Sequence, residues 1–272
     1  MPEKPAPRPE KAYASARFMG SRHARPLRIL SEYVHPEARF EALRISDTIV
    51  FFGSSRLQSR EVAEAALEAV RATGGDETAA AAQVGMSRYY EECRELARRL
   101  TDWSKGLEEK HRRFVVCTGG GPGIMEAANR GASEARGMNI GLSISIPNEE
   151  CGNAYITRNL GFEFHYFFMR KFWFVYLAKA LVAFPGGFGT LDEVFEVLTL
   201  VQTGKLRKRL PIVLYGRAFW DKVLNLDAMV EFGTISARDL DLFHRADSVD
   251  EAFAFITREL SENAMETPGV HL

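Results

Sequence analysis

Hydrophobic residues along the chain form short apolar runs that alternate with segments of helical periodicity. The apolar runs predict strands at 48–54, 113–119, 138–147, 162–168, 180–186 and 211–216. The intervening segments predict helices at 59–72, 86–109, 123–137, 169–179, 190–203, 217–231 and from 248 onward, with one or two more over 26–45. Residues 73–85 (TGGDETAAAAQVG) predict a loop.

Strands that are apolar throughout and separated by helices are typical of a parallel sheet with helices on both faces. We therefore predict a doubly wound, Rossmann-like α/β fold. Residues 27–272 are expected to form a single nucleotide-binding domain. Residues 1–26 are rich in Pro, Ala, Lys and Arg and poor in large apolar side chains, which predicts a mobile N-terminal arm.

The charge balance offers no general reason to bind nucleic acid, because 35 Lys and Arg face 36 Asp and Glu among 272 residues. A small ligand is the better expectation. The N-terminus lacks the apolar stretch of a secretory signal, and the most apolar segment, 172–184, contains Lys179, so no membrane span is expected. Cys93, Cys117 and Cys151 form no C-x-x-C pair, which favours a reducing, cytoplasmic location.

Three of the predicted strands end in glycine-rich or hydroxyl-rich loops: FFGSSR, CTGGGPGIME and FPGGFGTLDE. In a doubly wound sheet, ligands bind at the carboxyl ends of strands, and such loops let backbone amides approach a phosphate. A Walker A loop is missing, since Gly204-Lys205 is followed by Leu206, and G-x-G-x-x-G is not met in either glycine loop. A mononucleotide or sugar phosphate is therefore a better ligand than ATP or NAD.

Glu193 has two interpretations on the sequence alone. Thr190-Leu191-Asp192-Glu193 fits a capping box, as does 248–251, which has no glycine loop before it. By spacing alone this favours a structural Glu193. The strand and Pro-Gly-Gly loop in front of it favour instead a role in a ligand-binding site, because a phosphate bound by the loop would hold its sugar against the first turn of the helix. Glu196 would share its helix face and cleft.

Other titratable residues are less distinctive. Arg170 and Lys171 stand among aromatic residues in FFMRKFWF, where they either snorkel from a buried helix or hold a substrate anion. Cys117 lies in an apolar strand and is expected to be a core residue. No cluster has metal-ligand spacing, so we expect no metal.

Four motifs together resemble the Lonely Guy (LOG) family of cytokinin riboside 5′-monophosphate phosphoribohydrolases. They are GSS at 53–55, GGGPGIMEAANRGA at 119–132, MRK at 169–171 and PGGFGTLDE at 185–193, within a likeness covering roughly 46–216. The resemblance implies hydrolysis of the N-glycosidic bond of a purine nucleoside 5′-monophosphate, AMP or an N6-modified AMP, without a cofactor. It also implies a homodimer or higher homo-oligomer.

The resemblance assigns catalysis to Arg170 and Glu193. A carboxylate near C1′ would stabilise the positive charge that develops on the ribose. The resemblance assigns substrate binding to a larger set: Ser54, Gly119, Gly120, Gly121, Gly123, Lys171, Gly186, Gly187, Phe188, Gly189, Thr190, Leu191, Asp192 and Thr199.

Two alternatives accompany this hypothesis. Proteins of this kind have been labelled lysine decarboxylases, but a pyridoxal enzyme needs a Schiff-base lysine, and no lysine here stands in such a context. A non-catalytic carrier or sensor could use the same loops to bind a nucleotide or nucleotide-like cofactor. Retention of both Arg170 and Glu193 favours the enzyme. Bulky Phe172, Trp173 and Phe174 depart from the family pattern, which leaves base selectivity open.

Overall fold

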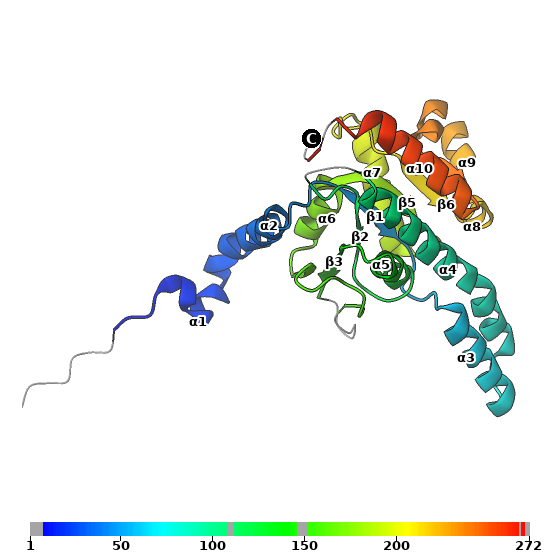
Figure 1. The fold of residues 1–272 in the computed structure, drawn as a ribbon, viewed down its shortest axis with the longest axis horizontal. Helices are drawn as coiled ribbons and strands as arrows, with labels where there is room; N and C mark the ends of the chain where they lie inside the picture. The colour runs from blue at the N-terminus through cyan, green and yellow to red at the C-terminus, as the bar shows by residue number, and fades with distance from the viewer. Residues whose placement is uncertain (1–7, 108–110, 146–151, 267, 270–272) are drawn as a thin grey trace, which may run out of the picture.

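Seven strands in the described part of the chain form one sheet in the order β4-β3-β2-β1-β5-β6-β7, with each recorded pair parallel; Figure 1 labels five of them. The computed structural model describes residues 8–107, 111–145, 152–266 and 268–269. The strands are β1 Thr48–Phe52, β2 Val115–Thr118, β3 Asn139–Ile144, β4 Gly161–Phe164, β5 Ala178–Ala183, β6 Ile212–Tyr215 and β7 His244–Ala246. The predicted doubly wound α/β fold is confirmed.

Helices connect these strands and cover both faces of the sheet. The α-helices are α1 Ala16–Met19, α2 Arg25–Ala42, α3 Arg60–Thr73, α4 Glu77–Lys105, α5 Ile124–Glu134, α6 Phe167–Tyr176, α7 Phe188–Gln202, α8 Arg217–Val223, α9 Leu226–Glu231 and α10 Val249–Asn263. Short 3-10 turns lie at η1 Ala12–Ala14, η2 Arg22–Ala24 and η3 Ala237–Leu242.

The two faces of the sheet bury two separate hydrophobic cores. Alternation along β1 sends Val50 and Phe52 into one core, with residues of α2, α6, α7 and α8. Ile49 and Phe51 enter the other, with residues of α4, α5 and α10. A strand buried on both faces reads as a continuous apolar run, which explains why the sequence pattern located it.

Several predicted boundaries were wrong. Residues 77–85 are the first turns of α4 rather than a loop, because Asp76 caps the helix and the alanines that follow are strong helix formers. Strand β5 begins at Ala178, so Lys179 lies in the strand instead of the preceding helix. The helix expected at 217–231 is broken into α8 and α9, and β7 was missed.

The N-terminal residues that the structure describes contain short helices before α2. Helix α2 contacts α6 through Tyr33 and Trp173, whose ring centroids are 5.7 Å apart, and the indole of Trp173 donates to the Glu32 carbonyl. Figure 1 shows α1 and α2 extending away from the sheet. Mobility of residues 1–26 stays a prediction, and residues 1–7 and Cys151 lie outside the described residues.

A buried group of charges lies at the amino ends of the strands. Asp47, which is 0% exposed, accepts a hydrogen bond from Arg113, and its other oxygen lies 3.7 Å from Lys179 Nζ. Arg113 also donates to the carbonyls of Ala264 and Met265. These contacts hold the segment after α10 against the amino-terminal ends of the strands. A doubly wound fold binds its ligands at the opposite, carboxyl-terminal ends.

None of the helices in the described part of the chain combines the length and apolarity needed to cross a membrane.

Candidate functional site

A cavity of about 700 Å³ lies at the carboxyl ends of β1 and β5, which we call the Glu193 cavity. The chain leaves β1 toward β2 on one side, while β5 and β6 continue the sheet on the other, so this is the topological switch point. Its walls come from the β1, β2 and β5 loops and from α6, α7 and α8. Ligand sites of open α/β sheets are expected at this position.

The glycine loop after β5 sets the start of α7. Gly186 approaches Thr190 so closely that an added Cβ would lie 2.1 Å from Thr190 Oγ1. Gly187 is the N-cap and offers no side chain to the first amides of the helix. The proposed capping box is therefore wrong at this position: α7 begins at Phe188, and Thr190 is already inside it. Glu193 consequently lies further along the helix, away from the cap amides.

Glu193 occupies the buried stripe of α7, together with Thr190, Val194 and Val197. Only 5% of the residue is exposed, yet its side chain lines the cavity. Burial raises the pKa of Glu193 to about 7, against the opposing charges of Lys171 and Arg170. A carboxyl group that titrates near neutral pH in a cleft is a candidate general base.

Lys171 joins three carboxylates on α7. Its Nζ lies 2.8 Å from Asp192, 2.7 Å from Glu196 and 3.8 Å from Glu193. Burial opposes the charge of Lys171, but the hydrogen bonds to Asp192 and Glu196 outweigh it and raise the pKa of the amine. Lys171 is therefore a fixed cation beside Glu193.

Arg170 lies between the Glu193 cavity and a second cavity of about 530 Å³. Its Nε donates to the Leu142 carbonyl at 2.8 Å, and the guanidinium lies 5.1 Å from the centroid of the Phe174 ring. An added Cβ at Gly119 would lie 2.6 Å from Arg170 Nη2 and 2.7 Å from Met125 Sδ, so a larger residue there would displace these two side chains. The arginine predicted to snorkel or to bind substrate thus lines both cavities.

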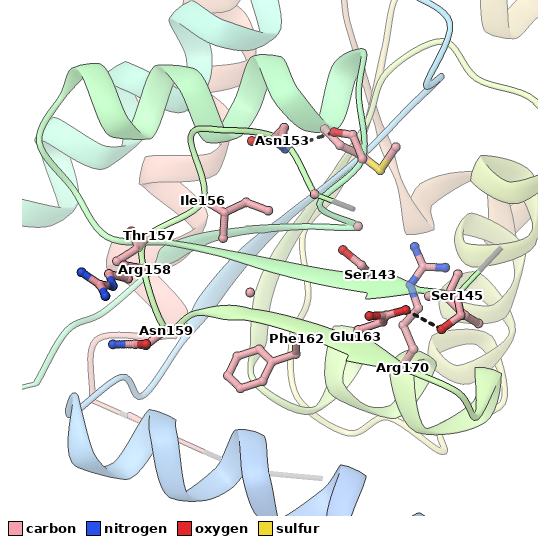
Figure 2. A pocket seen from close by; sticks show the side chains of 16 residues that line it. Ser143, Ser145, Asn153, Ile156, Thr157, Arg158, Asn159, Phe162, Glu163 and Arg170 are labelled. Carbon is pink, nitrogen blue, oxygen red and sulfur yellow. Dashed lines mark hydrogen bonds between the residues drawn. The ribbon is translucent and has the colours of Figure 1, made fainter. Parts of the chain in front are cut away.

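The loop between β2 and α5 is held in place by Asn153, whose amide Nδ2 donates to the carbonyl of Gly121 (Figure 2) and to that of Gly120. Gly120 has a φ of +74° and donates to Thr118 Oγ1 at 2.9 Å. Gly123, at φ +71°, is pressed against the Ser54 carbonyl, which accepts from Ile124 N. Gly120 and Gly123 shape the loop without lining either cavity.

The structure brings most of the predicted site residues to one place. Those that line the Glu193 cavity are Ser54, Gly119, Arg170, Gly186, Gly187, Phe188, Gly189, Thr190, Leu191 and Glu193. Gly121 lines the second cavity. Lys171, Asp192, Glu196 and Thr199 instead line a hollow on the outer side of α7. Glu193 and Glu196, expected in one cleft, therefore open onto different spaces, and their functional roles stay predictions.

Some lining residues were missed by sequence reasoning. Ser55 and Arg56 follow Ser54 in the same loop, so their position beside the GSS motif could have indicated that they line the cavity. Phe219 and Val223 belong to α8, and Phe167 to the first turn of α6. Nothing in the local pattern of α8 indicates that it reaches the cavity, because only packing on the sheet brings it there.

Lysines are unsuitably placed for a pyridoxal cofactor. No lysine is among the described residues that line the Glu193 cavity. Lys171 is protonated and ion-paired on the other side of α7. Burial lowers the pKa of Lys208 to about 7, but its Nζ donates to the carbonyls of Val175 and Tyr176, before β5 begins. These residues therefore do not fit a Schiff-base site.

The remaining sequence-based expectations concern the core position of Cys117 and the placement of possible metal ligands. Burial raises the pKa of Cys117 well above its usual range, and the side chain is 1% exposed in the core, as predicted. In the ranges that the structure describes, no group of three or more His, Cys, Asp or Glu side chains is placed to hold a metal ion.

Fold and site together define a doubly wound α/β protein with a glycine-rich loop and a buried acid at its switch point. Comparison with known proteins gives its relatives. The family model described as possible lysine decarboxylase matches residues 125–256, which include Arg170 and Glu193. The chain is 28% identical over 160 residues to the probable cytokinin riboside 5′-monophosphate phosphoribohydrolase LOG4 of Oryza sativa subsp. japonica, covering 57% of this chain and 67% of that protein. The resemblance to the LOG family is confirmed.

Solved structures with a similar fold include TM1055, a structural genomics target, at 22% identity and a TM-score of 0.47, covering 78% of this chain and 99% of that one. The Moco carrier protein of Chlamydomonas reinhardtii aligns at 20% identity and a TM-score of 0.48, covering 80% and 99%. At these values the likeness says nothing about the ligand of this chain.

Proposed function

We propose that this protein hydrolyses the N-glycosidic bond of a purine nucleoside 5′-monophosphate to give the free base and ribose 5-phosphate. The observation that carries the proposal is Glu193, a buried carboxyl group that lines a cavity together with Gly186, Gly187 and the first turn of α7. Similarity to the rice protein, whose name states this activity, supports the same reaction.

The 5′-phosphate is proposed to bind at the start of α7. The amides of this fifteen-residue helix receive no hydrogen bond from a side chain at the N-cap, Gly187. Such amides, together with the helix dipole, favour an anion. Gly186, Gly187 and Gly189 carry no side chains that would keep a phosphate away. Binding energy gained at the phosphate then fixes the sugar relative to Glu193.

Glu193 is proposed to serve the reacting centre. As the bond between C1′ and the purine nitrogen breaks, its electron pair leaves with the base, and positive charge develops on the ribose. Ionised Glu193 stabilises that charge and accepts a proton from the attacking water, whose oxygen bonds to C1′. The proton passes on to the base or to solvent. A pKa of about 7 suits a group that must accept and release a proton near neutral pH.

Arg170 is proposed to orient the reactants. Its guanidinium stays charged at any pH relevant to proteins, so it does not act as the acid. Its Nε donates to the Leu142 carbonyl and its side chain lines the cavity, so its charge can act on a ribose hydroxyl or on the carboxylate of Glu193. Removal of Arg170 is thus expected to impair both positioning and charge stabilisation.

The decisive test is turnover. Purified protein is incubated with AMP and, separately, with isopentenyladenosine monophosphate, and free base and ribose 5-phosphate are quantified by chromatography. Stoichiometric formation of both products supports the proposal. Tight binding of either nucleotide without products would show instead a carrier or sensor, the alternative from the sequence. Absence of both binding and turnover would refute both.

We also propose that the protein forms at least a homodimer. Light scattering with and without AMP gives the molar mass, and a monomer under both conditions would contradict this.

A further inference from the structure

Among the described residues that line the Glu193 cavity, those with charged side chains are Arg56, Arg170 and Glu193. The proposed reaction uses Arg170 and Glu193 and leaves Arg56 without a role. Arg56 is exposed, and no hydrogen bond or ion pair of its guanidinium is recorded in the described part of the chain. An arginine that lines a cavity without a protein partner keeps its N–H groups available to a ligand.

Backbone hydrogen bonds hold the loop that carries Arg56 beside the loop that begins α7. The Ser54 amide donates to the Pro185 carbonyl at 3.0 Å, directly before Gly186. The Ser54 carbonyl accepts from the Ile124 amide at 3.0 Å, which ties the same loop to the start of α5. The Arg56 amide donates to Ser54 Oγ at 3.1 Å and so fixes the turn that carries the arginine. Arg56 therefore belongs to a segment that is anchored next to the glycines where the phosphate is proposed to bind.

The proposed phosphate site needs more positive charge than the start of α7 provides. A phosphomonoester carries between one and two negative charges near neutral pH, whereas a helix N-terminus supplies only about half a positive charge. Arg170 lies on the β2 side of the cavity, where its Nε donates to the Leu142 carbonyl and its guanidinium lies beside Gly119. Among the described lining residues, this leaves Arg56 as the cation on the side of the β5 loop.

We propose that Arg56 binds the 5′-phosphate opposite the first amides of α7 and thereby makes the site depend on that phosphate. This inference rests on the proposed hydrolysis and assigns it a further substrate-binding residue. A guanidinium donates two parallel hydrogen bonds to two phosphate oxygens, which fixes orientation as well as distance. The phosphate keeps its charge while the bond at C1′ breaks, so Arg56 binds the ground state and the transition state equally.

The test measures kcat and KM for AMP and for adenosine in the wild type, Arg56→Gln and Arg56→Lys. In Arg56→Gln the KM for AMP is expected to rise by about 10- to 100-fold with kcat within about threefold, because a charged hydrogen bond common to both states is lost. Lysine restores the charge without the fork, so Arg56→Lys is expected to recover part of the loss. The constants for adenosine, which has no phosphate, are expected to stay within about threefold.

The matched control is Arg60→Gln, which removes the same charge at the start of α3, where Arg60 lines a different groove. An unchanged KM for AMP in Arg56→Gln, or an equal loss with AMP and adenosine, overturns the inference and leaves the proposed hydrolysis standing. If the wild type hydrolyses neither compound, the proposed function fails, and calorimetric titration with ribose 5-phosphate decides about Arg56 alone. Binding that weakens about tenfold or more in Arg56→Gln and not in Arg60→Gln supports the inference. Equal affinities of the wild type and Arg56→Gln, or no binding to the wild type, overturn it.

Discussion

Lys171 Nζ lies 3.8 Å from Glu193 Oε2, at the junction of α6 and α7. The lysine opens onto the outer hollow, whereas the glutamate lines the cavity. Their charges therefore interact through the protein, which has a lower effective dielectric constant than water. The pair lets a residue outside the cavity adjust the proton affinity of the acid within it.

Replacing Glu193 with Gln should abolish most of the proposed hydrolysis without displacing the nucleotide. The carboxamide keeps the shape but cannot accept the water proton or stabilise positive charge at C1′. We expect kcat to fall by about 10²–10⁴-fold with KM changed little. Glu196→Gln, one turn further along α7, is the matched control and should keep kcat within about threefold. Full activity in Glu193→Gln would contradict the mechanism.

The pH profile should report the carboxyl group of Glu193. Because the base form is required, kcat/KM is expected to rise with pH and to level off above a midpoint near pH 7, where burial sets the pKa of Glu193. In Lys171→Met the charge that lowers this pKa is gone, so the midpoint should move to higher pH by about 0.5–1 pH unit. The substrate phosphate also titrates near this range, but the variant cannot move its pKa. An unmoved midpoint would exclude Glu193 as the titrating group.

Burial of Glu193 should also make stability depend on pH. The pKa of Glu193 is about 7 in the folded protein against an ordinary value of 4.5. The folded state thus binds more protons between these values, and the free energy of unfolding falls as pH rises through that window. Glu193→Gln removes this cost and should exceed the wild type in stability at pH 8 by up to about 3 kcal/mol, with a smaller gain at pH 5. Urea unfolding at both pH values measures it.

Adjacent glycines in the loop should tolerate alanine differently. At Gly186 an added Cβ meets Thr190 Oγ1 at 2.1 Å, whereas at Gly187 nothing lies within 4 Å. Neither has a positive φ, so the difference is one of space. We expect Gly186→Ala to lower the free energy of unfolding by about 1–3 kcal/mol and Gly187→Ala to change it by less than about 0.5 kcal/mol. Thermal unfolding of both variants checks this, and equal effects would be inconsistent with the packing described.

Asp47 should matter for stability and not for chemistry. Asp47→Ala leaves the buried cations Arg113 and Lys179 without this carboxylate, a loss of about 3–5 kcal/mol. Because Asp47 lies at the amino ends of the strands, opposite to the Glu193 cavity, the folded fraction should keep its kcat. Chemical unfolding and turnover per folded molecule are the measurements. A large change in kcat without a loss of stability would contradict this separation.

Much of the fold could be read from local sequence. Runs such as TIVFF are buried on both faces of a parallel sheet, so every residue after Thr48 is apolar and the strand is evident. Predicted boundaries were wrong where local signals compete. The alanines at 79–82 favour a helix, whereas the nearby Gly74 and Gly75 favour a loop, and only the cap at Asp76 shows where α4 begins. Strand β7 is three residues long and half-exposed, too short for a hydrophobic pattern to mark.

The sequence by itself determined the doubly wound class, the glycine loops at strand ends and, through its resemblance to the LOG family, the choice of Arg170 and Glu193. These depend on residue type and near neighbours. The tertiary structure alone decided that Glu193 is a buried acid of the cavity rather than a cap, that Lys171 stands behind it, and that Arg170 joins two cavities. Such properties arise from burial and from contacts between segments that are distant in the sequence. Desolvation and neighbouring charges set the pKa of a side chain, and the packing of distant segments sets which cavity it lines.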